Sequence, residues 1–171
     1  MPGQPAIACI GLGRAYRGDD AVGHLVIREL KPLLPATVPC IPLNDDLTEL
    51  IPYLHQNDRI YLIDAYQSST PDAPEILRLE LTDPIRQISS LPTVSSHTLS
   101  LKQILQLALE LHGSLPTIVF YGVLGRNFQM GDPIHPQVKA RIPELVRQIS
   151  RDIQQQMLSV PHAANPGERC G

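Results

Sequence analysis

Three side chains capable of metal binding or acid–base chemistry occupy comparable places in this sequence. Asp20 follows a short apolar run and precedes a helical pattern, Asp64 ends another apolar run, and His97 precedes a second helical pattern. Two carboxylates and one imidazole form an incomplete ligand set that suits zinc, nickel, cobalt or iron and leaves positions open for water or substrate. A carboxylate in such a site can also act as a general base. We therefore take these three residues as the candidate site.

Each of the three residues also has a simpler structural explanation. Asp20 could cap the helix that follows it, because aspartate is a preferred N-cap residue. His97 could be a surface histidine in the first turn of its helix. Asp64 could accept a hydrogen bond from the following turn, but a carboxylate at the end of a buried strand is costly unless it is paired.

The helices and strands around these residues alternate along the chain. Apolar spacing and turn residues predict strands at 6–10, 38–43, 59–65, 76–81 and 117–123, and helices at 20–34, 47–55, 99–111 and from 136 to 157. The stretch 82–94 is predicted to be a loop. This order predicts an α/β fold, a single three-layer α/β/α domain with a mostly parallel five-stranded sheet and one antiparallel edge strand at 76–81. In such a sheet, Asp20, Asp64 and His97 all fall at the carboxyl edge, where ligands bind.

Other polar residues lie close to these positions in the sequence. Asp19 and Asp20 stand together before the first helix, and we expect one of them to cap it while the other points elsewhere. His24 shares a helix face with Asp20 and could be a fourth ligand or support a ligand, but we expect it to face solvent. Asp45 and Asp46 are expected in a solvated turn, with contact to substrate as the second interpretation.

Composition limits the classes of protein to consider. The chain has 171 residues, 43% of them hydrophobic and 18% charged, which is typical of a globular protein. We expect one domain over residues 1–158 and a disordered tail over 159–171. A net charge of −3 without a basic cluster argues against nucleic-acid binding, and no apolar run is long enough to cross a membrane. We further expect a monomer.

The cysteines and the N-terminus favour a cytoplasmic protein. Cys9, Cys40 and Cys170 lack the paired spacing of a metal site, and we expect Cys9 and Cys40 to be buried thiols on neighbouring strands. The N-terminal residues lack the basic and apolar regions of a signal peptide.

The glycines after the first strand offer a different interpretation. Gly11-Leu12-Gly13 is similar to the start of a dinucleotide-binding fingerprint, G-x-G-x-x-G/A. However, Tyr16 stands where that fingerprint requires a small residue, and acidic residues stand where a pyrophosphate would bind. No G-x-S-x-G motif is present and no cysteine has a plausible base, so serine or cysteine hydrolase chemistry is not supported.

Several segments together resemble the nickel–iron hydrogenase maturation endopeptidases. Residues 11–23 are similar to that family's opening, G-x-G-N-x-x-x-x-D-D/E-x-x-G, although Arg14 replaces the usual asparagine. Asp64-Ala65 is similar to the family's central D-A, and residues 95–99 to its S/T-x-H-x-L/M segment. Residues 122–123 and 128–133 resemble a subgroup that serves cytoplasmic hydrogenases. The resemblance covers about residues 6–155, but 44–48 depart from the family's D-G-G-T loop, which is tied to the choice of partner.

The resemblance implies a function and roles for the candidate residues. Enzymes of this family remove a C-terminal extension from the hydrogenase large-subunit precursor after nickel insertion. By motif match, Asp20, Asp64 and His97 would contact nickel carried by the precursor and would form the catalytic site. A non-enzymatic nickel-binding maturation chaperone using the same residues remains the alternative, and a nucleotide-binding Rossmann-like domain is a third.

Overall fold

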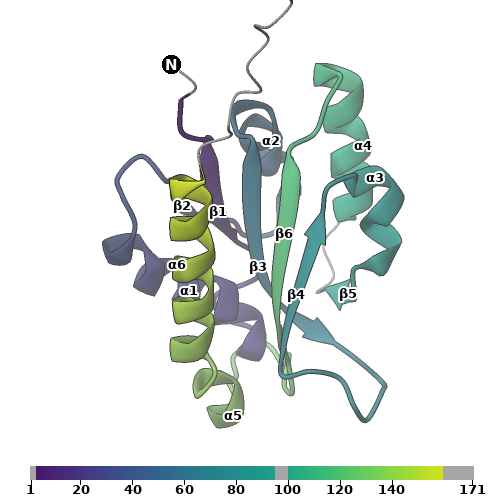
Figure 1. Cartoon of the computed structure of the whole chain (residues 1–171). Coiled ribbons are helices and arrows are strands. Elements are labelled where there is room, and N and C mark those ends of the chain that lie inside the picture. The colour runs from purple at the N-terminus through teal and green to yellow at the C-terminus, as the bar shows by residue number, and fades with distance from the viewer. Residues whose placement is uncertain (1–2, 95–99, 160–171) are drawn as a thin grey trace, which may run out of the picture.

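A twisted β-sheet runs through the middle of the molecule (Figure 1). The computed structural model describes residues 3–94 and 100–159. The main strands lie in the order β2-β1-β3-β6-β4, and β4 alone among them is antiparallel to its neighbour. Their bounds are β1 (Ile7–Gly11), β2 (Cys40–Pro42), β3 (Arg59–Gln67), β4 (Ile76–Leu81) and β6 (Thr117–Leu124). The predicted five-stranded, mostly parallel sheet with an antiparallel edge strand is therefore confirmed.

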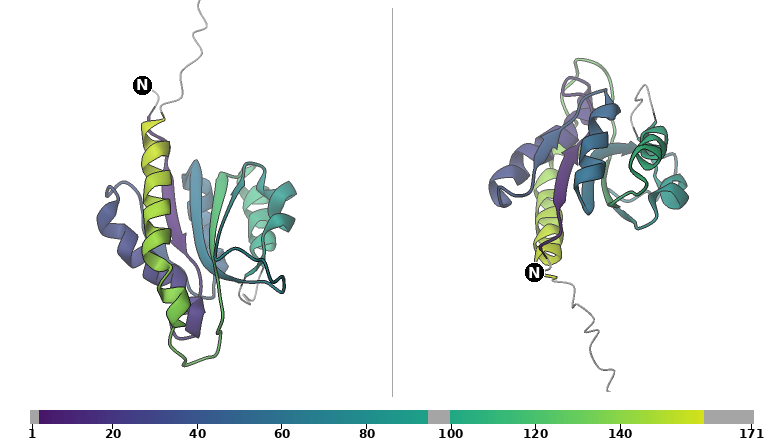
Figure 2. Two further views of the ribbon diagram at one scale, coloured as in Figure 1. Left: turned by 60° about the horizontal axis from the view of Figure 1, so that its bottom comes forward. Right: turned by 90° about the horizontal axis from the view of Figure 1, so that it is seen from above.

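Helices cover both faces of this sheet (Figure 2). One face is covered by α1 (Val22–Leu30), α5 (Pro136–Lys139) and α6 (Ile142–Leu158). The other face is covered by α2 (Ile51–Gln56), α3 (Pro84–Gln87) and α4 (Leu101–His112). The predicted three-layer arrangement is confirmed, and each face of the sheet contributes to a separate apolar core.

The central strand β3 shows why the sheet is buried on both sides. Successive side chains of a strand point to opposite faces. Tyr61 and Ile63 accordingly pack into the core beneath α1 and α6, whereas Ile60 and Leu62 pack into the core beneath α2 and α4. A strand buried in this way needs apolar residues at consecutive positions, which is the pattern that the sequence shows.

Two glycines let α1 pack directly onto the end of β1. A Cβ at Gly11 would overlap the carbonyl oxygen of Gly23, and a Cβ at Gly23 would overlap the carbonyl oxygen of Leu12. Gly11 is therefore required by close packing of two backbones rather than by an unusual backbone angle. This close approach fixes the start of α1 at the carboxyl edge of the sheet.

Some predicted elements are shorter or divided in the structure. The helix predicted at 20–34 consists of a 3-10 turn (Gly18–Ala21), α1 and a second 3-10 turn (Lys31–Leu33). The strand predicted at 38–43 is shorter, Cys40–Pro42, and it is flanked by hydrogen bonds from Cys9 N to Pro39 O and from Leu43 N to Gly11 O, each at 2.8 Å. The predicted loop 82–94 was wrong in part, because it contains α3, a 3-10 turn (Ile88–Ser90) and β5 (Thr93–Val94), which is antiparallel to β3.

Other local predictions agree with the structure. Ser100 and Gln103 form a capping box at the start of α4, and Gly113 ends the helix with a φ of 78°. Cys9 and Cys40 are register partners on β1 and β2, and both are buried free thiols, as predicted. The predicted tail falls almost wholly on residues 160–171, which lie outside the described residues. No helix in the described ranges has the length and apolar character needed to cross a membrane.

A cluster of polar side chains, remote from the candidate site, joins α6 to the sheet through hydrogen bonds. The carboxylate of Asp152 accepts hydrogen bonds from the hydroxyls of Tyr61 and Tyr121, each at 2.9 Å. Arg78 on β4 also donates to Asp152, at 2.9 Å, and pairs with Glu80. Burial, followed by the hydrogen bond to Asp152, raises the pKa of Tyr121 to about 12.

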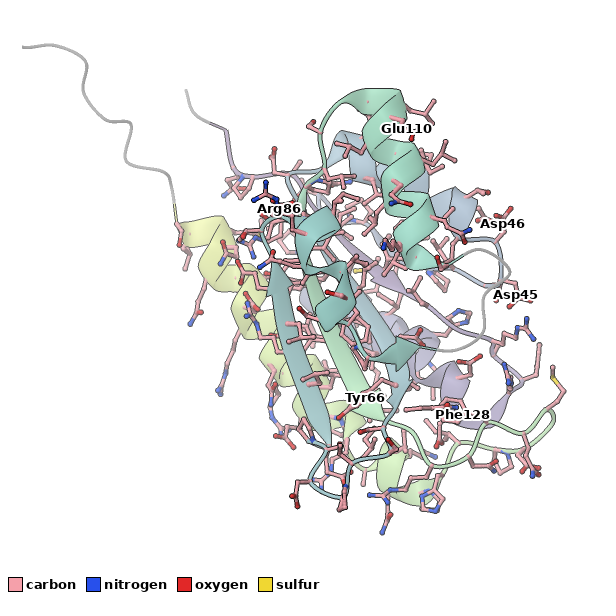
Figure 3. All side chains as sticks on the ribbon, turned by 90° about the vertical axis from the view of Figure 1, so that its right-hand side faces the viewer. Asp45, Asp46, Tyr66, Arg86, Glu110 and Phe128 are labelled. Atoms are coloured by element: carbon pink, nitrogen blue, oxygen red, sulfur yellow. The ribbon has the colours of Figure 1, made fainter. Side chains whose placement is uncertain are left out.

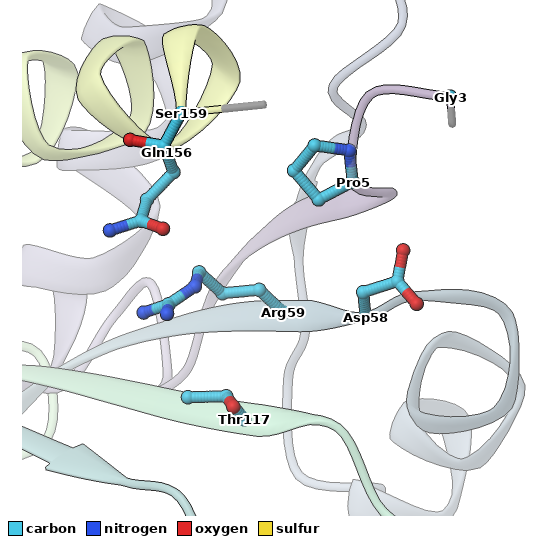
Figure 4. A pocket seen from close by; sticks show the side chains of 7 residues that line it. All are labelled: Gly3, Pro5, Asp58, Arg59, Thr117, Gln156 and Ser159. Carbon is cyan, nitrogen blue, oxygen red and sulfur yellow. The ribbon is translucent and has the colours of Figure 1, made fainter. Parts of the chain in front are cut away.

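A pocket of about 420 Å³ lies at the amino edge of the sheet (Figure 4). It is lined by the beginnings of β3 and β6, through Arg59 and Thr117, and by the end of α6, through Gln156. Asp20 and Asp64 lie at the opposite, carboxyl edge, so this pocket is separate from them.

Candidate active site

The loop after β1 brings Asp20 into the interior. Leu12 donates a backbone hydrogen bond to the carbonyl oxygen of Ile63 at 2.8 Å, which ties this loop to β3. Gly13 then turns with a φ of 115°, and a Cβ there would overlap the carbonyl oxygen of Asp20. Glycine is therefore required at position 13 for the loop to lie against Asp20.

The carboxylate of Asp20 is only partly satisfied. Its side chain is 1% exposed, and Oδ2 accepts a hydrogen bond from the backbone N of Arg14 at 3.2 Å. Within residues 3–94 and 100–159, Oδ1 is buried and has no hydrogen-bond partner. A buried acceptor without a partner costs roughly 1–3 kcal/mol, and more when it is charged. This oxygen is therefore available to accept a hydrogen bond from a ligand or a water molecule, or to take up a proton.

Asp64 is the second buried carboxylate of this edge. It lies near the end of β3, on the same face as Ile60 and Leu62, and its side chain is wholly buried. Its Oδ1 accepts a hydrogen bond from the backbone N of Ala65 at 2.8 Å. The simpler sequence-based explanation, a hydrogen bond to the following backbone, is thus also present.

The fold places Asp20 and Asp64 at the same edge of neighbouring strands. β1 and β3 are parallel neighbours, and the 3-10 turn that carries Asp20 contacts β3. Asp20 follows β1, and Asp64 lies within the last residues of β3, which extends to Gln67, so both acids are at the carboxyl edge that the sequence predicts. Figure 3 shows Tyr66 and Phe128 near this edge, on segments that follow Asp64 and β6.

The third candidate, His97, lies outside the described residues. The chain before it is placed by β5, in which Val94 pairs with Tyr66, two residues beyond Asp64. The chain after it enters α4 at Leu101. Within the described ranges no group of three or more histidine, cysteine, aspartate or glutamate side chains is arranged to hold a metal ion. The ligand set that includes His97 stays a prediction.

Asp19 has a structural role that the sequence analysis did not predict. Its buried carboxylate accepts backbone hydrogen bonds from Arg126 at 2.6 Å, Asn127 at 2.8 Å and His135 at 2.7 Å. The prediction that Asp19 or Asp20 caps the helix was wrong, because neither side chain caps the 3-10 turn or α1. Asp19 instead fixes a loop that follows β6, and no local pattern signals a partner so distant in sequence.

Further bonds join the two loops of this edge, which we name the β1 loop (residues 12–17) and the β6 loop (residues 125–135). The carbonyl oxygen of Tyr16 accepts from the backbone N of Gly131 at 2.7 Å, and Gly18 donates to the carbonyl oxygen of Asp132 at 3.1 Å. The side chain of Arg17 donates to the carbonyl oxygen of Phe128 at 2.9 Å. These bonds fix the two loops relative to each other and to the turn that carries Asp20.

The rim of the site is formed by a loop after β2. Arg14 forms an ion pair with Asp45, so the cation that replaces the family's asparagine has a partner within the chain. Asp46 accepts a hydrogen bond from the backbone N of Thr48 at 3.0 Å, and the hydroxyl and amide of Thr48 lower the pKa of Asp46. Figure 3 shows Asp45 and Asp46 side by side on this loop.

His24 does not face solvent, contrary to the expectation from the sequence. It is half-buried, and its Nε2 lies 2.8 Å from the carbonyl oxygen of Leu43. The contact joins α1 to the segment after β2, and the spacing of His24 within its helix gave no sign of it. We assign His24 a structural role.

The β1 loop is poorly suited to bind a nucleotide. In a dinucleotide-binding loop, backbone amides and the positive helix terminus bind the pyrophosphate. Here the amides of Leu12 and Arg14 are bonded to Ile63 and to the carboxylate of Asp20. A buried carboxylate beside those amides would repel phosphate, which argues against the Rossmann-like alternative.

Comparisons with known proteins find this fold among solved structures but find no match in sequence. No family model matches the chain, and no curated protein matches its sequence. A NiFe hydrogenase maturation protease HycI from Thermococcus kodakarensis KOD1 is similar in structure, with a TM-score of 0.69, 24% identity, and coverage of 89% of this chain and 94% of that one. The hydrogenase maturating endopeptidase HybD from E. coli superposes with a TM-score of 0.71 and 23% identity, covering 87% and 92%.

This chain has the fold of the hydrogenase maturation proteases. HybD from Thermococcus kodakarensis shows the same likeness, with a TM-score of 0.68 and 20% identity, over 86% of this chain and 97% of that one. In these three comparisons the shared fold covers 86–89% of this chain. At such low identity the likeness concerns the fold, so the chemistry must be argued from the residues at the carboxyl edge.

Proposed function

We propose that this protein is an endopeptidase that removes the C-terminal extension of a NiFe hydrogenase large-subunit precursor after nickel insertion. The observation that carries the proposal is the buried Oδ1 of Asp20, which has no hydrogen-bond partner in the described part of the chain and lies at the same sheet edge as Asp64. The fold shared with proteins named as hydrogenase maturation proteases supports it.

In this proposal, nickel is part of the substrate. Asp20, Asp64 and His97 contact the nickel ion that the precursor carries, which places the scissile peptide bond beside the carboxylates. A metal in that position polarises a carbonyl group or lowers the pKa of a water molecule. We assign Asp20 the role of general base, because its Oδ1 has no hydrogen-bond partner in the described residues and can accept a proton from water.

The environment and partner follow from the same proposal. The partner is the large-subunit precursor, and the protease acts as a monomer in the cytoplasm. The buried free thiols of Cys9 and Cys40 are compatible with a reducing compartment. The loop around Asp45 is the surface on which the choice among precursors is proposed to depend, since it departs from the family's motif and forms the rim of the site.

The decisive experiment is processing of a purified precursor, followed by mass spectrometry. Nickel-loaded precursor should lose its C-terminal extension, whereas metal-free precursor should keep it. Asp20→Asn, Asp64→Asn and His97→Ala should each abolish the mass change. His112→Ala is the matched control for His97→Ala, because His112 stacks on His55 in a part of the chain unrelated to the site.

The same experiment separates the proposal from the chaperone alternative. A nickel-binding chaperone would leave the mass of the precursor unchanged while nickel content is transferred. Unchanged precursor mass after incubation with folded wild-type protein would contradict the proposed protease. Circular dichroism spectra and melting temperatures of each variant would show that lost processing does not result from unfolding.

A further inference from the structure

Two large apolar side chains lie exposed on the two loops that are hydrogen-bonded to each other at the carboxyl edge of the sheet. Tyr16, in the β1 loop, is 80% exposed, and Met130, in the β6 loop, is 67% exposed. The loops meet through the hydrogen bond from the backbone N of Gly131 to the carbonyl oxygen of Tyr16, at 2.7 Å. The backbones of two exposed apolar residues, more than a hundred positions apart in sequence, are thus brought together, and we name these residues the Tyr16–Met130 pair.

The position of this pair is fixed relative to Asp20. Within the β1 loop, Arg14 donates its backbone N–H to the carboxylate of Asp20 at 3.2 Å, two residues before Tyr16. The β6 loop is held by the carboxylate of Asp19, the neighbour of Asp20. Both members of the pair therefore belong to loops that are hydrogen-bonded to the Asp19–Asp20 turn.

The charged groups around the pair have partners within the chain. Arg14 is paired with Asp45, and Asp132 accepts a hydrogen bond from the side chain of Asn127 at 2.8 Å. Arg17 donates to the carbonyl oxygen of Phe128. These groups are thus engaged within the chain, and the exposed ring and thioether of the pair match an apolar partner segment.

The size of the pair favours a transient contact. A large aromatic side chain buries about 150–250 Å² on contact. Two side chains are therefore far short of the ~800 Å² per partner that a stable complex between two proteins buries. A second copy of this chain would need a larger surface, whereas a substrate segment needs to be held only during cleavage. Tyrosine and methionine are also among the residues enriched at interfaces.

We propose that Tyr16 and Met130 are substrate-binding residues, which contact an apolar segment of the precursor polypeptide beside its scissile bond. This inference rests on the proposed endopeptidase function and specifies how the substrate chain is held. The aromatic ring and the thioether side chain supply the contact; the hydroxyl of Tyr16 does not.

The test is steady-state processing of the nickel-loaded precursor by Tyr16→Ala, Met130→Ala and the double variant. Loss of a binding contact should raise KM about 5- to 20-fold in the single variants, with kcat changed less than about threefold. Tyr16→Phe and Met130→Leu keep the apolar surface and should retain the KM of the wild type. Leu111→Ala and Leu158→Ala are matched controls, because these exposed leucines end helices at the amino edge.

The outcomes distinguish this inference from the function on which it rests. Wild-type protein that leaves the precursor intact contradicts the protease function itself. Normal processing by the wild type combined with an unchanged KM in the double alanine variant overturns the role of the Tyr16–Met130 pair alone. Loss of self-association in the double variant without a change of KM would also overturn it, because the pair would then bind a second copy of the chain.

Discussion

The carboxylate of Asp19 lies 2.6 Å from the backbone N of Arg126, which is 107 residues further along the chain. Two more backbone amides of the β6 loop donate to the same carboxylate. Through this one side chain, the position of the β6 loop is coupled to the turn that carries Asp20. The relationship makes Asp19 a positioning residue, since its own oxygens are already used by the backbone.

Asp19→Asn should destabilise the protein and disorganise the site. An asparagine amide offers one acceptor oxygen and places N–H donors against backbone N–H groups, so at least one bond becomes a repulsive contact. We expect the free energy of unfolding in urea to fall by about 2–4 kcal/mol. Asp72→Asn, which changes an exposed loop carboxylate in the same way, should leave the unfolding free energy unchanged.

Asp20→Asn should separate stability from activity. The substitution removes a buried charge, and its side-chain oxygen can still accept from the backbone N of Arg14. We expect the free energy of unfolding to stay constant or to rise by about 1–2 kcal/mol, because an incompletely paired buried charge is costly. Processing of the precursor should be lost. A strongly destabilised Asp20→Asn protein would show instead that the carboxylate is a structural group.

Asp152→Ala should loosen α6 from the sheet without removing the site. The change leaves the hydroxyls of Tyr61 and Tyr121 and the guanidinium of Arg78 without their shared acceptor. We expect a loss of about 2–4 kcal/mol in the free energy of unfolding, measured by urea titration. The exposed ion pair of Arg86 with Asp83 is the control, and Asp83→Ala should cost less than about 1 kcal/mol.

Alkaline pH should destabilise the protein through the tyrosines of this cluster. Burial and Asp152 raise the pKa of Tyr121 to about 12 and also raise the pKa of Tyr61. In the unfolded chain, tyrosine loses its proton near pH 10, so between pH 10 and about 12 the folded state holds more protons than the unfolded state. Stability should be unaffected by these groups below pH 10 and should fall as pH rises through this window.

The measurement for the alkaline prediction combines two signals. Ultraviolet absorbance reports tyrosinate formation, and circular dichroism reports unfolding. Part of the tyrosine absorbance should appear only together with the loss of structure. If all tyrosines titrate near pH 10 while the circular dichroism spectrum stays native, the buried Tyr61–Tyr121–Asp152 cluster does not exist in solution.

Much of the scaffold followed from local patterns in the sequence. A continuous apolar run identified β3 as a central strand, and alternation identified β4 as the antiparallel edge strand. Because parallel strands joined by helices share one carboxyl edge, the positions of Asp20 and Asp64 could be predicted from the order of the elements alone. The sequence also predicted that Cys9 and Cys40 lie on neighbouring strands, and they are register partners on β1 and β2.

Only the tertiary structure decided what these polar side chains contact. Asp19 could cap a helix as well as it could bind the β6 loop, and His24 could face solvent as well as Leu43. Such choices depend on which distant segment comes within hydrogen-bonding distance, and helical or strand periodicity carries no information about that distance. The residue types and their order along the chain therefore determined the candidate chemistry. Packing between distant loops decided that the carboxylate of Asp19 binds backbone amides, whereas Oδ1 of Asp20 has no hydrogen-bond partner in the described residues.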